Sequence, residues 1–172
     1  MNKVLLYGGT GQSKIIKDIV DDLTDYSIKG VIDDTVNLDQ PFGVDFFIAG
    51  KDCYQTWKAQ TPDYKDYFFA ITIGNPHGKV RKRLYKRLED DGLKPMNFIH
   101  PNAEINNKLS SKGLQIHSRS ILNPFSLIGN YCIINTAAIV EHDCILEDCV
   151  EVGPNATVCG QVYIGENTWL GA

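Results

Sequence analysis

His142 and Asp143 place an imidazole next to a carboxylate in the stretch AAIVEHDCILEDC, residues 137–149. An imidazole titrates near neutral pH, so it can take a proton from an attacking nucleophile. A neighbouring carboxylate can orient the ring and stabilise its protonated form. The pair is a candidate general base with its orienting acid. The alternative is an exposed turn histidine with no chemical role.

A glycine-rich turn follows the first apolar run of the chain, KVLLY, residues 3–7. Gly8, Gly9 and Gly11 precede a segment of helical spacing, where backbone N–H groups and a helix N-terminus suit a diphosphate. The motif is weak alone, because GGTGQS lacks the third glycine of GxGxxG and the chain has no GxxxxGK[ST]. An ordinary strand-end turn is the alternative.

Polar residues also end the next two apolar runs. Asp33 and Asp34 follow IKGVI, about 20 residues after the glycines, where a dinucleotide fold carries its ribose-binding acid. Asn75 follows FFAITIG, residues 68–74. We expect all three to line the crevice beside the glycine turn, with ordinary strand-end turns as the alternative.

The first part of the chain alternates strand and helix patterns. Such alternation predicts a Rossmann-like α/β domain with a parallel sheet over residues 1–101, including strands at 28–32, 66–74 and 95–99. The helix after Pro76 turns its apolar side inward. We expect its cationic residues to form a solvated face, with phosphate or nucleic-acid binding as the alternative. These residues are Arg81, Lys82, Arg83, Lys86 and Arg87.

After about residue 102 an aliphatic residue recurs at every sixth position. The series runs through Ile116, Leu122, Ile128, Ile134, Val140, Leu146, Val152, Val158, Ile164 and Leu170. A period of six does not match the 3.6-residue period of a helix. It predicts an all-β parallel β-helix over residues 102–172, in which each hexad supplies one side and one corner of a prism. His142, two residues past Val140, should then point outward near a corner.

Small residues stand four positions after each aliphatic one, and Cys132 and Cys144 are among them. We therefore expect both thiols in the prism interior. The five cysteines have no CxxC spacing, which favours free thiols in a reducing cytoplasm and argues against a zinc site.

Bulk properties exclude several other classes. The net charge of −4 argues against nucleic-acid binding. No apolar run approaches the roughly 20 residues of a membrane span, and the start does not read as a signal peptide. We predict a cytoplasmic protein.

The whole chain resembles the bacterial nucleotide-sugar acetyltransferases of the PglD/NeuD type. The resemblance covers VLLYGGTGQS, VIDD, FFAITIGN, FIHPNA and NTAAIVEHD in this order. It implies that the N-terminal domain binds a nucleotide-linked amino sugar, with Asp33 and Asp34 near the nucleobase. It also implies a homotrimer of left-handed β-helices with acetyl-CoA as co-substrate between subunits, and no metal. By the same resemblance His142 is the base, Asn135 positions the acetyl donor and the Gly160 N–H bonds the thioester carbonyl.

The chain departs from that family at three places. Gln12 and Glu151 stand where many relatives have histidine, and NTWLGA ends part-way through a hexad where relatives continue. The first hypothesis is N-acetylation of a nucleotide-linked 4-amino sugar in surface-glycan synthesis. The alternatives are O-acetylation of a sialic-acid-type sugar, and a nucleotide-sugar-binding protein without turnover. An NAD-dependent oxidoreductase would leave half of the chain unexplained. The nucleotide, the sugar and the acyl chain are left open.

Overall fold

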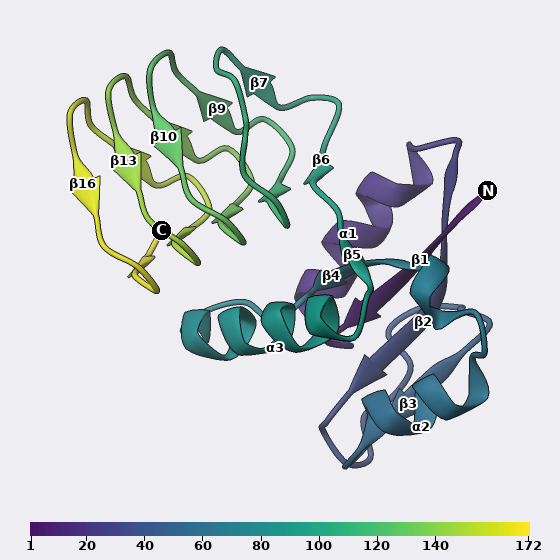
Figure 1. Cartoon of the computed structure of the whole chain (residues 1–172). Coiled ribbons are helices and arrows are strands. Elements are labelled where there is room, and N and C mark those ends of the chain that lie inside the picture. The colour runs from purple at the N-terminus through teal and green to yellow at the C-terminus, as the bar shows by residue number, and fades with distance from the viewer. The chain divides into compact units, whose positions relative to one another are not determined.

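The computed structural model describes all 172 residues, Met1–Ala172. The chain divides into two compact units, each visible in Figure 1. The N-terminal unit comprises Met1–Ile73 and Leu84–Met96, and the repeat unit comprises Gly74–Arg83 and Asn97–Ala172.

A five-stranded parallel sheet forms the centre of the N-terminal unit, in the order β3-β2-β1-β4-β5. Its strands are β1 (Asn2–Tyr7), β2 (Tyr26–Asp33), β3 (Phe47–Ala49), β4 (Phe68–Ile71) and β5 (Lys94–Pro95). The central strand β1 buries the apolar run at residues 4–7 completely or nearly so. Continuous apolar strands of this kind are typical of a parallel sheet covered on both faces. The predicted α/β class is confirmed.

The helices are α1 (Gly11–Asp21), α2 (Cys53–Gln60) and α3 (Gly78–Asp90), with a short 3-10 helix η1 (Tyr64–Asp66). The helix α1 buries Ile16, Ile19 and Val20. The sequence pattern predicts no element between residues 34 and 66. There α2 buries Tyr54 and Trp57, whose rings stack with centroids 6.0 Å apart.

The repeat unit consists of two-residue strands that pair in parallel into three sheets (Figure 1). One sheet holds β6 (Phe98–Ile99), β8 (Gln115–Ile116), β11 (Ile133–Ile134), β14 (Glu151–Val152) and β17 (Trp169–Leu170). A second holds β7 (Glu104–Ile105), β9 (Ile121–Leu122), β12 (Ile139–Val140) and β15 (Thr157–Val158). The third holds β10 (Leu127–Ile128), β13 (Ile145–Leu146) and β16 (Tyr163–Ile164). Successive hexads occupy successive sheets, which confirms the predicted parallel β-helix.

The interior of the prism contains the residues that the six-residue period selected. Nine of the ten aliphatic positions are buried, from Ile116 to Ile164, and Leu170 packs against them while half-buried. Cys132 and Cys144 lie in the same core with no exposed surface, as predicted. All five cysteines are free thiols.

Each corner of the prism has one residue in the left-handed region of backbone conformation, again at every sixth position. These residues are Arg119, Phe125, Tyr131, Ala137, Asp143, Cys149, Asn155, Gln161 and Asn167, with φ between 57° and 64°. The conformation costs a non-glycine residue about 1–2 kcal/mol. Backbone hydrogen bonds between coils offset part of this cost; for example, the N–H of Ala137 donates to the carbonyl of Ser118 at 3.0 Å.

The predicted strand over residues 95–99 is wrong as a single element. Residues 94–95 form β5 in the N-terminal sheet, whereas residues 98–99 form β6, which pairs with β8 in the repeat unit. Asn97 marks the change, because its side chain donates to the carbonyl of Ser111 and accepts from the N–H of Leu114. An apolar run shows that a segment is buried, but it does not say against which sheet.

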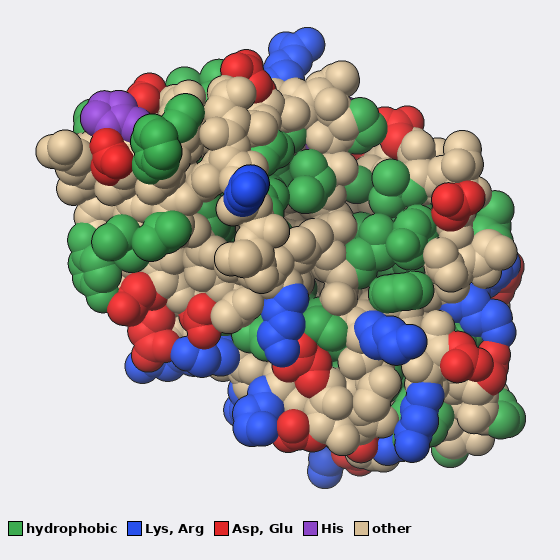
Figure 2. Space-filling model, turned by 45° about the horizontal axis from the view of Figure 1, so that its top comes forward, with side chains coloured by type: hydrophobic (Ala, Val, Ile, Leu, Met, Phe, Trp, Pro, Cys, Tyr) green, Lys and Arg blue, Asp and Glu red, His purple; other side chains and the backbone are tan.

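Large apolar side chains reach the surface of both units; Figure 2 shows such groups (green) on one face of the molecule. No helix is both long enough and apolar enough to span a membrane.

Candidate active site

His142 lies at the corner that joins β12 to β13, residues 141–144, which we call the histidine corner. Its side chain points outward and is 55% exposed, as predicted. The Nδ1 atom lies 2.8 Å from Oδ2 of Asp143. A carboxylate can only accept, so Nδ1 carries a proton, and in the neutral form of the ring Nε2 is the lone-pair nitrogen. The structure brings the predicted base and its orienting acid together.

Gly160 lies against the other edge of the same imidazole. A methyl group added to its Cα would stand 2.7 Å from Nε2 and 2.8 Å from Cε1 of His142. The N–H of Gln161 donates to the carbonyl of His142 at 3.0 Å, which fixes one coil on the other at this corner. Because residue 160 is glycine, the ring has room and the backbone beside Nε2 is open to a ligand.

Asn135 lies at a different corner, the asparagine corner, residues 135–138, which joins β11 to β12. Its Nδ2 donates to the carbonyl of Val152 at 2.9 Å and lies 3.4 Å from Oε1 of Glu151. The asparagine and histidine corners flank the short strand β12 at opposite ends. A single chain therefore does not bring Asn135 and His142 together.

A buried ion pair lies next to Asn135. Nη1 of Arg81 donates to Oε2 of Glu151 at 3.0 Å, with side chains only 1% and 4% exposed. Nη2 of Arg81 donates to the carbonyl of Cys149 at 2.8 Å, and Nδ2 of Asn75 donates to Oε1 of Glu151 at 3.2 Å. The predicted solvated face is therefore wrong for Arg81. Its partner could not be predicted from a local pattern, because Glu151 lies 70 residues away.

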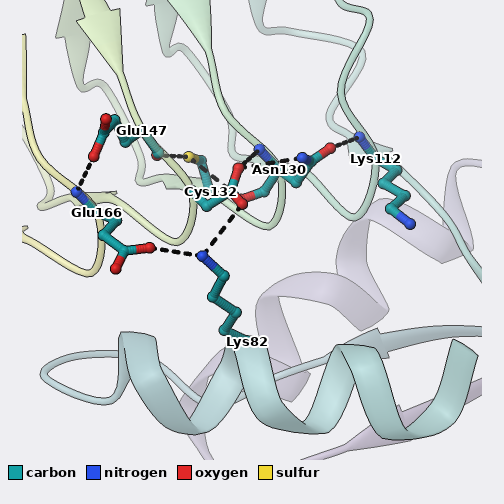
Figure 3. A network of polar contacts seen from close by, with 7 residues as sticks. Lys82, Lys112, Asn130, Cys132, Glu147 and Glu166 are labelled. Carbon is teal, nitrogen blue, oxygen red and sulfur yellow. Dashed lines mark hydrogen bonds and ion pairs between the residues drawn. The ribbon is translucent and has the colours of Figure 1, made fainter. Parts of the chain in front are cut away.

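A second network joins the start of α3 to the prism (Figure 3). Nζ of Lys82 lies 2.6 Å from a carboxylate oxygen of Glu166 and 3.5 Å from one of Asp148. The N–H of Glu166 donates to Oε2 of Glu147, and the N–H of Asn130 donates to Oδ1 of Asp148. These side chains are partly exposed, so this network is more open to water than the Arg81–Glu151 pair.

Two backbone N–H groups of the glycine turn already donate hydrogen bonds within the N-terminal unit. The N–H of Gly8 donates to the carbonyl of Ile32 at 2.8 Å, and the N–H of Gly9 donates to Oδ2 of Asp33 at 2.7 Å. Gly8 has φ +123°, and a Cβ there would stand 2.4 Å from the carbonyl oxygen of Thr72, so only glycine fits. Since both N–H groups are engaged, a phosphate role for this turn rests on Gly11 at the start of α1.

The two aspartates also have partners within the N-terminal unit. Asp33 accepts a second hydrogen bond from the N–H of Thr35 at 2.8 Å. Asp34 accepts from the hydroxyl of Tyr7 at 2.9 Å and from the thiol of Cys53 at 3.3 Å. Burial, together with the Asp34 carboxylate, raises the pKa of the Cys53 thiol to about 12, so it stays a protonated donor. The structure brings Asp33 to the glycine turn, whereas Asn75 bonds to Glu151 in the repeat unit.

The model of the PglD N-terminal domain family matches residues 3–88, half of the chain. The chain belongs to this family. The resemblance to PglD-type proteins is thereby confirmed. No group of three or more His, Cys, Asp or Glu side chains is placed to hold a metal ion.

Individual relatives of this PglD-type chain are acetyltransferases. The GDP-perosamine N-acetyltransferase of Escherichia coli O157:H7 is 29% identical over 115 residues, 63% of this chain and 49% of that protein. The chain therefore spans about half the length of this curated relative.

Solved structures of such enzymes share the fold. PerB from Caulobacter crescentus, in complex with CoA and GDP-perosamine, has a TM-score of 0.80 at 26% identity, covering 99% of this chain and 78% of that one. The acetyltransferase domain of PglB from Neisseria gonorrhoeae FA1090, in complex with acetyl coenzyme A, has a TM-score of 0.78 at 22% identity. That match covers 98% of this chain and 78% of that domain.

Proposed function

We propose that the chain transfers the acetyl group of acetyl-CoA to the amine of a nucleotide-linked 4-amino sugar. The observation that carries the proposal is the geometry of His142, whose Nδ1 is held by Asp143 while Nε2 faces the open backbone at Gly160. The relatives named as N-acetyltransferases support the reaction class, and GDP-perosamine is the first acceptor to test.

The reaction needs a base that first takes a proton and then returns it. Nε2 of His142 accepts a proton from the sugar nitrogen as that nitrogen attacks the thioester carbonyl. The C–N bond forms, the C–S bond breaks, and the imidazolium gives its proton to the leaving CoA sulfur. Asp143 stabilises the imidazolium through Nδ1. The backbone N–H of Gly160 is the proposed donor to the carbonyl oxygen, where negative charge develops.

The N-terminal unit is the proposed nucleotide-binding part, with a Rossmann-like fold. Its strand order, β3-β2-β1-β4-β5, brings the carboxyl ends of β1 and β2 side by side. Ligands of such sheets bind outside those ends. We propose that Asp33 and Asp34 lie near the nucleobase of the bound sugar nucleotide, and that Gly11 and the start of α1 face its phosphates. We also propose that residues 102–172 carry the acyltransferase site.

We further propose that the active unit is a homotrimer in which the site is shared between copies. Leu127, Ile145 and Tyr163 are in register on the β10-β13-β16 sheet and are 64%, 42% and 62% exposed. This apolar ladder begins directly after the histidine corner and is the proposed contact surface. A neighbouring copy packed there would bring its asparagine corner to His142, which a single chain does not do.

An acetyl-transfer assay tests the proposed function. Purified protein is incubated with acetyl-CoA and a panel of UDP-, dTDP- and GDP-linked amino sugars, and free CoA thiol is followed. We expect release that depends on one amino sugar, and His142→Ala should lower kcat by about 10²–10⁴-fold, the usual contribution of a general base.

Two results would contradict the proposal. Near-normal turnover by His142→Ala would remove the base assignment. Binding of a sugar nucleotide with no thiol release from the wild-type protein would favour a binding protein instead.

A further inference from the structure

We propose that Glu151 is a positioning residue for Asn135, held in place by Arg81. This inference rests on the proposed acetyl transfer and assigns part of the site to a buried carboxylate. The start of α3 would thereby set the geometry of the asparagine corner.

The Glu151 carboxylate is fixed on both of its oxygens. Oε2 accepts from Arg81, while Oε1 accepts from Asn75 and faces Nδ2 of Asn135. The whole residue is 3% exposed. A buried, paired carboxylate has little freedom to move, because leaving either charge of the pair unpartnered is costly.

This arrangement decides which way the Asn135 carboxamide points. Its two neighbours on one side, Oε1 of Glu151 and the carbonyl of Val152, are both acceptors. An amide can satisfy two acceptors only with its NH2 group, so Nδ2 faces the prism and Oδ1 faces away. Glu151 and the carbonyl of Val152 together thus make Asn135 an outward acceptor.

An outward amide oxygen suits a ligand that brings an N–H donor. The proposed reaction offers two of these: the amine of the sugar acceptor and the amide N–H groups in the arm of CoA. An acceptor fixed in this way aligns the two substrates at no cost in side-chain ordering when they bind. If the carboxamide rotates freely, that alignment is lost although the fold is intact.

Shortening Glu151 by one methylene tests the position of its carboxylate while its charge is kept. Glu151→Asp keeps a buried negative charge near Arg81 but withdraws the carboxylate oxygens from Nδ2 of Asn135 and from Nη1 of Arg81. We expect kcat to fall about 10-fold or more, in line with the cost of a misplaced reacting group. Asn135→Ala should lose at least as much, and Asn135→Ala/Glu151→Asp should lose no more than Asn135→Ala alone, because both changes remove the same interaction.

Glu166→Asp is the matched control. Glu166 forms an ion pair with Lys82 of the same helix at 2.6 Å and makes no hydrogen bond with the side chain of Asn135. The same one-methylene change there should leave kcat within about twofold of the wild type, since partly exposed ion pairs contribute little.

A measurement independent of turnover covers the case in which Glu151→Asp does not fold. In the NMR spectrum of the wild-type protein, the side-chain NH2 protons of Asn135 should exchange slowly with water, because both face protein acceptors. Rapid exchange in the wild type would overturn the proposal without any variant.

The kinetic outcomes separate the two proposals. Normal turnover by a folded Glu151→Asp variant, or losses that multiply in the double variant, would overturn the positioning role alone. No turnover by the wild-type protein would overturn the proposed function, and this inference with it.

Discussion

The chemistry available to the imidazole of His142 depends on the contacts of its two nitrogens. Nδ1 meets a carboxylate at 2.8 Å, and Nε2 meets a residue without a side chain. The first contact sets which nitrogen carries the proton, and the second leaves space beside Nε2 for the groups of the proposed acetyl transfer. A base needs both conditions, because an unoriented or covered ring cannot reach the proton it must take.

Gly160→Ala tests this geometry at a single atom. The new methyl group would lie 2.7 Å from Nε2, so the ring must turn away from its position and from Asp143. Gly160 itself has no left-handed backbone conformation, so alanine adds no backbone strain. We expect kcat to fall about 100-fold, the usual cost of a misplaced catalytic group, with the melting temperature close to that of the wild type. CoA release and thermal unfolding measure the two quantities.

The matched control for that substitution is Gly165→Ala, where a Cβ would meet no atom within 4 Å. Its turnover should stay near that of the wild type. If both alanine variants were equally active, the imidazole would not depend on the space that Gly160 leaves.

Single residues show where sequence reasoning succeeds and where it stops. His142 could be placed outward because a local repeat fixes the direction of each side chain. Arg81 could not be placed, because it stands among cations that do face water, and its partner comes from a distant coil. The partners of Asp33 and Asp34 were missed for the same reason: the hydrogen bonds of the Gly9 N–H, Tyr7 and Cys53 depend on tertiary contacts.

At the scale of elements, the six-residue repeat specifies almost all of the prism. Each hexad needs one buried aliphatic residue and one corner, so the sequence period translates directly into burial and backbone conformation. The N-terminal unit offers no such period. Its α2 and β3 (Phe47–Ala49) are short and were not predicted, and one apolar run, residues 95–99, serves two sheets.

The first coils of the prism contain a histidine that is sensitive to pH. His117 follows β8 and has no exposed surface. Burial, and to a smaller extent the charge of His100, lowers the pKa of His117 to about 4. The unfolded chain takes up this proton near the ordinary value of 6.5, whereas the folded chain does so only near 4. The free energy of unfolding should therefore decrease as the pH falls from about 6.5 to about 4, by about 3 kcal/mol at most.

Urea unfolding at a series of pH values measures this effect. His117→Gln removes the titrating group and should flatten the pH dependence between about 6.5 and 4, whatever its effect at pH 8. An unchanged slope in this variant would show that other groups titrate in that range.

At the scale of the whole molecule, the residues proposed to act together lie apart within one chain. The histidine corner and the asparagine corner flank opposite ends of β12, and Arg81 and Glu151 support only the second. We therefore propose that the activity of the prism depends on its assembly, with one copy supplying His142 and Asp143 and a neighbour supplying Asn135.

Mixed trimers of two inactive variants test this most directly. His142→Ala and Asn135→Ala are co-expressed with different tags, and total trimers are purified and assayed for acetyl transfer. In mixed trimers some sites receive His142 from one copy and Asn135 from the other, so a random 1:1 mixture should regain about a quarter of wild-type activity. His142→Ala and Asp143→Asn both change the histidine corner, so no copy in their mixture has an intact His142–Asp143 pair. This mixture should regain none of the activity that requires that pair. Mixed trimers of the first two variants that stay inactive would contradict a site shared between copies.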